Sequence, residues 1–179
     1  MIRVFFGLEL PEELRERIAM ISGGIERARF VPADSLHITL RFIGEVDEPT
    51  AHDIAQAADD VRFEPVAVTL VGAGHFESRN RVSTVWLGVE PSAELIRLRQ
   101  RIEASLVRAG LAPERRKFKP HVTVARINQG RPDEIHHWLA ANTMFRAVPF
   151  LARRFVLYSS TLGREGPTYT AECSFPQPR

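Results

Sequence analysis

The chain has 179 residues, of which 44% are hydrophobic and 26% are charged. This composition is typical of a globular domain with a substantial core, and not of an intrinsically disordered chain. The formal net charge is only +2 at pH 7, which is compatible with an anionic ligand without requiring one. The single cysteine, Cys173, excludes an intramolecular disulfide framework and a cysteine-based zinc site.

No stretch of the sequence is typical of a targeting or membrane segment. The N-terminal residues lack a basic region followed by a long apolar run, and no apolar run reaches the roughly 18 residues that span a bilayer. We therefore expect a cytoplasmic protein.

The first part of the chain predicts strands that alternate with helices. Pro11 followed by two glutamates is typical of a helix start, and Gly23-Gly24 of a helix end. The expected elements are strands over 4–10, 36–43 and 66–71, helices over 11–22 and 50–61, and turns over 30–35. The glycine-containing segment 72–81 is predicted to be a loop.

The second part repeats this pattern. An amphipathic helix is expected over 92–109, with Gly110 as its cap. The remaining expected elements are strands over 82–89, 119–126, 148–151, 154–158 and 168–175, a helix from 131, a basic loop over 114–120 and a turn over 163–166.

The repeated order indicates an internal duplication within one domain of residues 1–179. Two His-x-Thr motifs lie 84 positions apart (121 − 37), and two Gly-apolar-Glu segments lie 81 apart (88 − 7). We expect repeat halves of about 2–71 and 82–175. The predicted fold is α+β, with two pseudo-symmetric lobes that flank a central cleft, each a mostly antiparallel sheet with helices on its outer face.

The two motifs are the candidate active-site residues. They read Leu36-His37-Ile38-Thr39-Leu40 and Pro120-His121-Val122-Thr123-Val124. Side chains alternate along a strand, so the histidine and the threonine of each motif share one face. One such motif has little weight, because threonine is common in strands. Two copies at equivalent positions predict a cleft with two imidazoles and two hydroxyls.

Two imidazoles near neutral pH suit acid–base chemistry on a phosphodiester. One neutral ring deprotonates a water molecule, and one protonated ring donates to the departing oxygen. Thr39 and Thr123 would hold the non-bridging oxygens of the phosphate. No metal or other cofactor is needed, and two histidines without carboxylates or thiols are a poor zinc site.

Three further residues are candidates for substrate binding. Arg41 lies two positions after Thr39, so alternation predicts that it faces the phosphate. Arg126 has the opposite parity to Thr123 and would reach the cleft only through a bulge or at the strand end. Phe118 is a candidate for stacking on a base, with a place in the core as the alternative. An ion-paired or solvated role is the alternative for both arginines.

The remaining charged and histidine residues are less informative. The basic cluster of Arg115, Arg116, Lys117 and Lys119 would either steer RNA or simply be solvated. The other histidines are expected to be structural or exposed: His52, His75, His136 and His137.

At its motifs the sequence resembles the 2H phosphoesterase superfamily, and more closely the bacterial RNA 2′,3′-cyclic phosphodiesterases, historically called 2′-5′ RNA ligases. The resemblance extends to the opening Arg3-Val4-Phe5-Phe6-Gly7-Leu8, to Phe118-Lys119-Pro120 before the second motif, and to the closing Leu157-Tyr158-Ser159-Ser160. It implies a bilobal fold and metal-independent hydrolysis of an RNA terminal 2′,3′-cyclic phosphate to a 2′-phosphate. By motif order it also implies that His37 is the proton donor and His121 the proton acceptor.

The expected partners are RNA 3′ ends or small cyclic nucleotides, bound by a monomer. Two alternatives remain open on sequence alone. One is a non-catalytic RNA-binding module, and the other is 2′-5′ RNA ligation by the reverse reaction.

Overall fold

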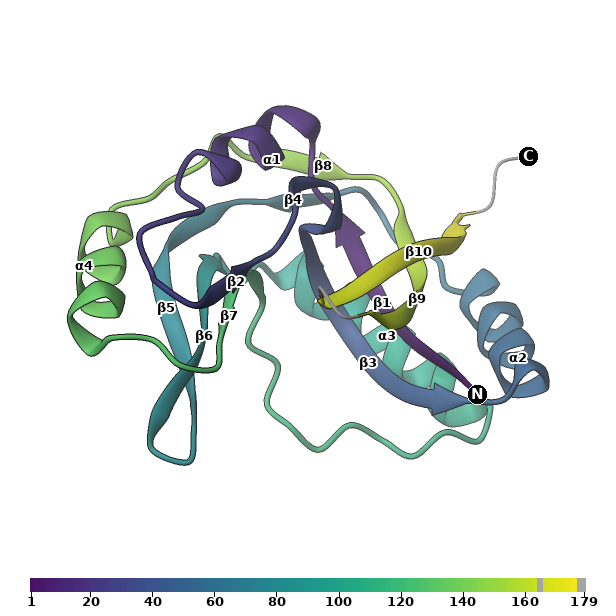
Figure 1. Ribbon diagram of the computed structural model, residues 1–179. Helices are drawn as coiled ribbons and strands as arrows, with labels where there is room; N and C mark the ends of the chain where they lie inside the picture. Colours follow the sequence, from purple (N-terminus) through teal and green to yellow (C-terminus); the bar gives the residue numbers. More distant parts are fainter. Residues whose placement is uncertain (164–165, 177–179) are drawn as a thin grey trace.

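The computed structural model describes residues 1–163 and 166–176 (Figure 1). The helices within these residues are α1 (Glu12–Ala19), α2 (Glu48–Asp59), α3 (Ala93–Arg108) and α4 (Pro132–Asn142), with a 3-10 turn at Ala33–Ser35. The strands are β1 (Ile2–Glu9), β2 (Ala28–Phe30), β3 (His37–Val46), β4 (Val66–Val68), β5 (Leu70–Ser78), β6 (Arg81–Val89), β7 (His121–Ile127), β8 (Phe150–Ala152), β9 (Phe155–Gly163) and β10 (Gly166–Phe175).

The strands form one long antiparallel sheet and one short pair. The order in the long sheet is β10-β9-β1-β3-β7-β6-β5, with β2 also paired to β7, and β4 pairs with β8. Its centre is a narrow junction, because β3 and β7 are paired only at Ile38 and Val122. The predicted α+β class with mostly antiparallel strands is confirmed.

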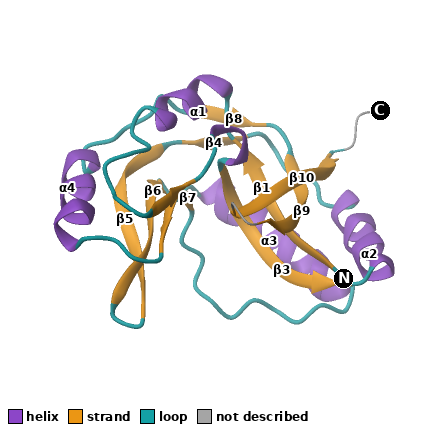
Figure 2. Ribbon diagram, viewed as in Figure 1, coloured by secondary structure: helices purple, strands orange, loops and turns teal. Residues whose placement is uncertain are grey.

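The junction divides the sheet into two lobes, with helices around the strands (Figure 2). We call β10, β9, β1 and β3 the first lobe; α2 and α3 pack together and contact it. We call β2, β7, β6 and β5 the second lobe; α4 contacts β5, and Trp138 of α4 donates a hydrogen bond to the carbonyl of Ile21, just after α1. Each lobe therefore combines elements from both halves of the sequence.

The helices α2 and α3 begin where the sequence supplies a side-chain cap and an apolar face. The side chain of Ser92 accepts a hydrogen bond from the amide of Leu95 at the start of α3, and Asp47 does the same for Thr50 in α2. The buried stripe of α3 is the one expected from its spacing: Leu95, Leu98, Ile102 and Leu106. The buried apolar residues of both lobes form one continuous core.

The prediction of a loop over 72–81 is wrong, because β5 runs through most of it. Gly74 favours a loop on sequence grounds, yet the structure uses it for close packing. A Cβ at Gly74 would lie 2.2 Å from the ring of Trp86 on the neighbouring strand. The sequence analysis does not predict β2. The predicted turn at 163–166 includes residues 164–165, which lie outside the described residues.

Candidate active site

The backbone holds the two motif imidazoles in the same way. Nδ1 of His37 lies 2.8 Å from the carbonyl oxygen of Ser35, and Nδ1 of His121 lies 2.7 Å from that of Lys119. A carbonyl oxygen only accepts hydrogen bonds, so Nδ1 carries the proton in each neutral ring. Nε2 of each ring is therefore left with a lone pair for chemistry.

The junction of the two lobes brings the motifs together. Ile38 and Val122 are paired and fully buried. In an antiparallel pair this register sets His37 across from Thr123 and His121 across from Thr39, all on the face opposite the buried residues. The predicted alternation within each motif is thus present in the structure.

Aromatic rings surround each imidazole. The His37 ring centroid lies 4.8 Å from that of Phe5, 5.0 Å from that of Tyr169 and 5.8 Å from that of Tyr158. These contacts hold the ring in place and shield it from water.

His121 has an equivalent environment in the second lobe. Its ring centroid lies 4.8 Å from that of Phe76 and 5.8 Å from that of Trp86. Lys119 Nζ lies 4.6 Å from the centroid of the Trp86 ring, which places a cation beside this imidazole.

Burial disfavours the charged form of both rings. It lowers the pKa of His37 to about 4, although the hydrogen bond to Ser35 acts in the opposite direction. Burial also lowers the pKa of His121, and the charges of Lys119 and Arg126 add to that effect. A charge on His121 further lowers the pKa of His37, so the two rings are close enough to interact.

A cavity of about 700 Å³ lies beside the first motif. His37 and Thr39 line it, together with three arginines from three different strands: Arg3, Arg29 and Arg126. His121 and Thr123 do not line this cavity, and the junction register places them next to it. The three guanidinium groups make the cavity suitable for an anion.

A bulge in each motif strand decides which arginine faces this cavity. In β7 the partners of Thr123 and Ala125 are Trp86 and Val85, so Val124 is the extra residue. The bulge reverses the alternation and turns Arg126 to the exposed face, where it lines the cavity. Arg126 therefore reaches the cleft through a bulge, which is one of the two ways that the sequence allowed.

An equivalent bulge in β3 has the opposite consequence for Arg41. Thr39 and Arg41 pair with Gly7 and Phe6, so Leu40 is the extra residue. Arg41 turns inward and is 8% exposed. Its guanidinium lies 2.6 Å from Glu103 and donates to the carbonyl of Ala112 at 2.7 Å. The prediction that Arg41 shares the face of His37 is wrong.

A family model places these features among known proteins. The model described as the 2′-5′ RNA ligase superfamily matches residues 10–164. The chain belongs to this superfamily. The family expected from the paired motifs is thereby confirmed.

Two relatives and one solved structure extend the comparison. An RNA 2′,3′-cyclic phosphodiesterase of Aeropyrum pernix is 45% identical over 102 residues, which cover 56% of this chain and 58% of that protein. An RNA 2′,3′-cyclic phosphodiesterase of Thermotoga maritima is 32% identical over 182 residues, which cover 97% of this chain and 96% of that protein. A crystal structure of Escherichia coli LigT complexed with 3′-AMP has a TM-score of 0.77 and 30% identity, with 99% of each chain covered.

The other candidate residues lie away from the site. Phe118 packs against the core, with the guanidinium of Arg99 5.7 Å from its ring centroid, and it does not line the cavity. The four remaining histidines are exposed, as expected.

Sequence reasoning missed the aromatic residues around the imidazoles and two of the three cavity arginines. Phe76 falls in the segment predicted to be a loop, whereas its ring packs edge-on against that of His121. Arg3 and Arg29 carried no spacing signal that would link them to either motif.

Two kinds of feature are absent from the described residues. None of the helices there is long and apolar enough to cross a membrane. In the same residues, no group of three or more His, Cys, Asp or Glu side chains is arranged to hold a metal ion.

Proposed function

We propose that this chain hydrolyses the terminal 2′,3′-cyclic phosphate of RNA to a 2′-phosphomonoester, with the 3′ oxygen as the leaving group. One observation carries the proposal: two imidazoles on adjacent strands have Nδ1 tied to the backbone and Nε2 free, beside a cavity with three arginines. Relatives named RNA 2′,3′-cyclic phosphodiesterase and a related structure with 3′-AMP support this substrate class.

The reaction needs one proton acceptor and one proton donor. A water oxygen attacks phosphorus while Nε2 of one histidine takes its proton. The bond from phosphorus to the 3′ oxygen breaks, and that oxygen takes a proton from Nε2 of the other histidine. Thr39, Thr123 and Arg126 stabilise the charge on the non-bridging oxygens.

We assign His37 as the donor and His121 as the acceptor, following the order of the motifs. In the free site His37 has a pKa of about 4, so it is neutral near pH 7 until substrate binds. A bound phosphate anion stabilises imidazolium and raises that pKa. The assignment therefore requires that the substrate itself charges His37.

The decisive experiment uses a short RNA that ends in a 2′,3′-cyclic phosphate, with the position of the product phosphate determined. We expect a 2′-phosphate, and a loss of about 10²-fold to 10⁴-fold in kcat for His37→Ala and for His121→Ala. Circular dichroism of both variants checks that they fold. If either folded variant kept near-full activity, the two-imidazole mechanism would be wrong; RNA binding without product would instead support a binding module.

A modified substrate tests the assignment of roles. Sulfur in place of the 3′ bridging oxygen gives a leaving group that needs no proton. With this substrate, the variant that lacks the proton donor should lose less activity than it does with the natural substrate. The variant that lacks the proton acceptor should lose as much activity with both substrates. A smaller loss for His121→Ala than for His37→Ala would reverse the assignment.

The proposal includes three further expectations. The donor set of imidazoles and hydroxyls predicts activity that EDTA does not change. We also propose that the protein acts as a monomer in the cytoplasm. Its substrates would be RNA 3′ ends or small cyclic nucleotides.

A further inference from the structure

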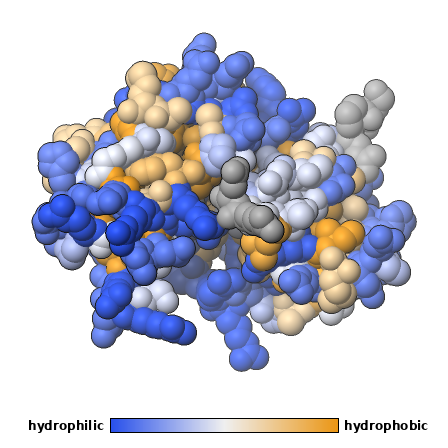
Figure 3. Space-filling model, in the orientation of Figure 1, coloured by the Kyte–Doolittle hydropathy of each residue, from blue (hydrophilic) through white to orange (hydrophobic). Residues whose placement is uncertain are grey.

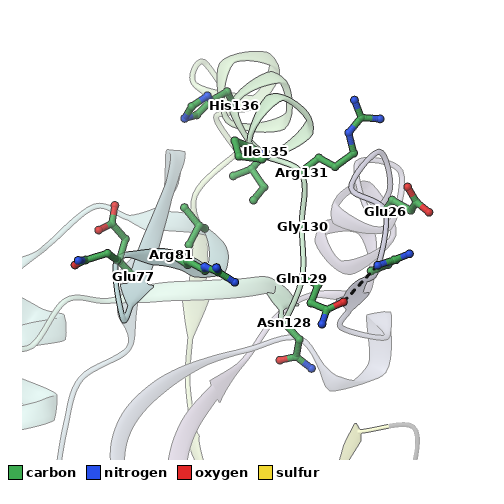
Figure 4. Close-up of a pocket in the computed structure, with 13 residues that line it drawn as sticks. Glu26, Glu77, Arg81, Asn128, Gln129, Gly130, Arg131, Ile135 and His136 are labelled. Carbon is green, nitrogen blue, oxygen red and sulfur yellow. Dashed lines mark hydrogen bonds between the residues drawn. The ribbon is translucent and has the colours of Figure 1, made fainter.

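A second cavity, of about 650 Å³, lies at the far end of β7 (Figure 4). It is bordered by the hairpin of β5 and β6, the segment that joins β7 to α4, and the loop before β2. Most of its polar groups are guanidinium and amide groups: Arg27, Arg81, Arg131, Asn80, Asn128 and Gln129. None of the candidate catalytic residues lines it.

The second cavity adjoins the first at the exit of β7. Asn128 lines both cavities. Thr123, Arg126 and Asn128 succeed one another along β7 and its exit, and five residues of extended chain span roughly 16 Å. An RNA strand whose 3′ end lies at the imidazoles would follow this line past Arg126, and an earlier nucleotide would reach the second cavity.

The charges of the second cavity fit one phosphate group and not a dense polyanion. Glu26 and Glu77 also line it, so its three arginines leave a small positive excess. Arg131 lies 3.5 Å from Asp133, and Arg27 donates a hydrogen bond to Gln129 at 3.3 Å.

Arg81 differs from the other two arginines of the cavity. In the part of the chain that the structure describes, neither Arg81 nor Arg27 has a carboxylate within 4.0 Å of its guanidinium, but Arg27 is held by Gln129, whereas Arg131 is ion-paired. Figure 4 shows its side chain directed toward the segment of Asn128 and Gly130. Arg81 is therefore the cation that is available to a ligand.

The remaining lining residues fit a nucleoside. Val82 and Pro132 supply apolar surface on which a base can pack. The side-chain amides of Asn80 and Asn128 offer both donors and acceptors for a base edge. Figure 3 shows mainly hydrophilic residues over the side of the molecule where the β5–β6 hairpin and α4 lie, which suits a polar ligand.

We propose that this second cavity binds a nucleotide upstream of the cyclic phosphate, with Arg81 on its phosphate. The proposal rests on the proposed function and extends it: the preferred substrate is an oligonucleotide, and a cyclic mononucleotide fills only the first cavity. The basic loop around Arg115 provides the competing path for the RNA strand, because that residue is also exposed.

The test compares two substrates in three proteins. The substrates are a 2′,3′-cyclic mononucleotide and a tetranucleotide with the same 3′ end. The proteins are the native chain, Arg81→Ser, and Arg115→Ser as a control that removes the same charge from the basic loop. KM and kcat are measured over a range of salt concentrations.

For the native chain we expect a lower KM for the tetranucleotide than for the mononucleotide. Arg81→Ser should raise the tetranucleotide KM about tenfold, as for one charge-assisted contact, and leave kcat and the mononucleotide KM unchanged. It should also reduce the slope of log KM against log salt by about 0.7, as for one phosphate contact on a single strand. Arg115→Ser should change neither the tetranucleotide KM nor the slope of log KM against log salt.

Equal KM values for the two substrates in the native chain would overturn this inference while leaving the proposed function intact. An effect of Arg115→Ser without an effect of Arg81→Ser would place the strand over the basic loop and would also overturn it. Absence of turnover with both substrates would instead contradict the proposed function. Binding of a 2′-phosphate-ended tetranucleotide, measured by fluorescence anisotropy, would then still show whether Arg81 contacts RNA.

Discussion

Burial sets the protonation state of both imidazoles before substrate binds. Productive catalysis needs one ring protonated and the other neutral. Below about pH 4 both rings are protonated, so neither can accept a proton. Above the lowered pKa of His121 both rings are neutral, so neither can donate a proton. Between these limits the assigned roles use the minor form with His37 protonated and His121 neutral, whose population follows the same bell. We therefore expect a bell-shaped profile of kcat/KM with its optimum on the acid side of the ordinary histidine value of 6.5.

The profile of kcat should differ from that of kcat/KM in a specific direction. Because bound phosphate raises both histidine pKa values, the kcat optimum should lie at higher pH. Rates for a cyclic mononucleotide between about pH 4 and pH 9 measure both profiles. A kcat/KM optimum in the alkaline range would contradict the environment described for these rings.

Lys119 offers a way to shift one limb of this profile. Its positive charge helps to lower the pKa of His121. Lys119→Met removes the charge, so that pKa should rise and the alkaline limb of kcat/KM should move to higher pH. Lys117→Met, two residues earlier in the same loop, is the matched control and should leave the limb in place.

Arg41 and Arg126 have opposite roles, although both follow a His-x-Thr motif. Arg41→Ala leaves Glu103 without its 2.6 Å partner in a largely buried site, so unfolding free energy should fall by about 3 kcal/mol. Arg126→Ala should lower kcat about a hundredfold with little change in stability, because this side chain is exposed. Urea unfolding and initial rates of both variants measure the contrast. A stable but inactive Arg41→Ala protein would restore Arg41 as a substrate ligand.

At the scale of the elements, the sequence predicts correctly which face each side chain of a motif strand occupies, as far as the bulge in that strand. Strand alternation was sufficient for His37, Thr39, His121 and Thr123, because they precede the bulge. A bulge depends on how the neighbouring strand pairs, which the spacing of residues within one strand does not encode. The side chain after the bulge, Arg41, was therefore assigned to the wrong face.

The aromatic shells could not be predicted for a related reason. Tyr158 and Tyr169 contact His37 from the β9–β10 hairpin, more than a hundred residues away in the sequence. Each aromatic residue alone is compatible with an ordinary core position. Only the pairing of β9 with β1 brings this hairpin to the motif.

The repeated Gly-apolar-Glu segments acquire a physical explanation from the strand pairing. Gly7 pairs with Thr39, and Gly88 pairs with His121, so a glycine lies across from each motif. A Cβ added to Gly7 would lie 3.0 Å from the carbonyl oxygen of Ile38. A Cβ added to Gly88 would lie 2.6 Å from the carbonyl oxygen of Val71.

Alanine at these two glycines should therefore destabilise the protein to different extents. We expect Gly88→Ala to lower the unfolding free energy by about 2 kcal/mol, because backbone must move, and Gly7→Ala to cost less. Chemical denaturation of the two variants gives the comparison. Gly23→Ala is the control, since nothing lies within 4 Å of a Cβ there. Equal stability of all three variants would show that these close approaches are easily relieved.

At the scale of the whole molecule, we propose that the two halves of the sequence arose by duplication. In this scheme β1, α1, β3, α2, β4 and β5 correspond to β6, α3, β7, α4, β8 and β9. The pairs β3 with β7 and β4 with β8 would then lie on the pseudo-twofold axis. The order of elements was predictable from the repeated motifs. The exchange of elements between the lobes was not, because spacing in a sequence does not specify which lobe a helix covers.

This exchange predicts that the two lobes unfold together. α3 comes from the second half of the sequence and packs in the first lobe with α2, while the segment after α1 binds α4 in the second lobe. Both tryptophans, Trp86 and Trp138, lie in the second lobe, so tryptophan fluorescence reports on that lobe alone. Far-UV circular dichroism reports on the helices and strands of both lobes.

We expect the two signals to give the same midpoint and the same slope in urea, as for a single cooperative transition. The continuous core across the junction supplies the physical reason, since unfolding one lobe would expose apolar surface of the other. A fluorescence transition that precedes the circular dichroism transition would mean that the second lobe unfolds independently. The narrow β3–β7 junction would then be a hinge between two separately stable units, and catalysis would depend on how often the imidazoles meet across it.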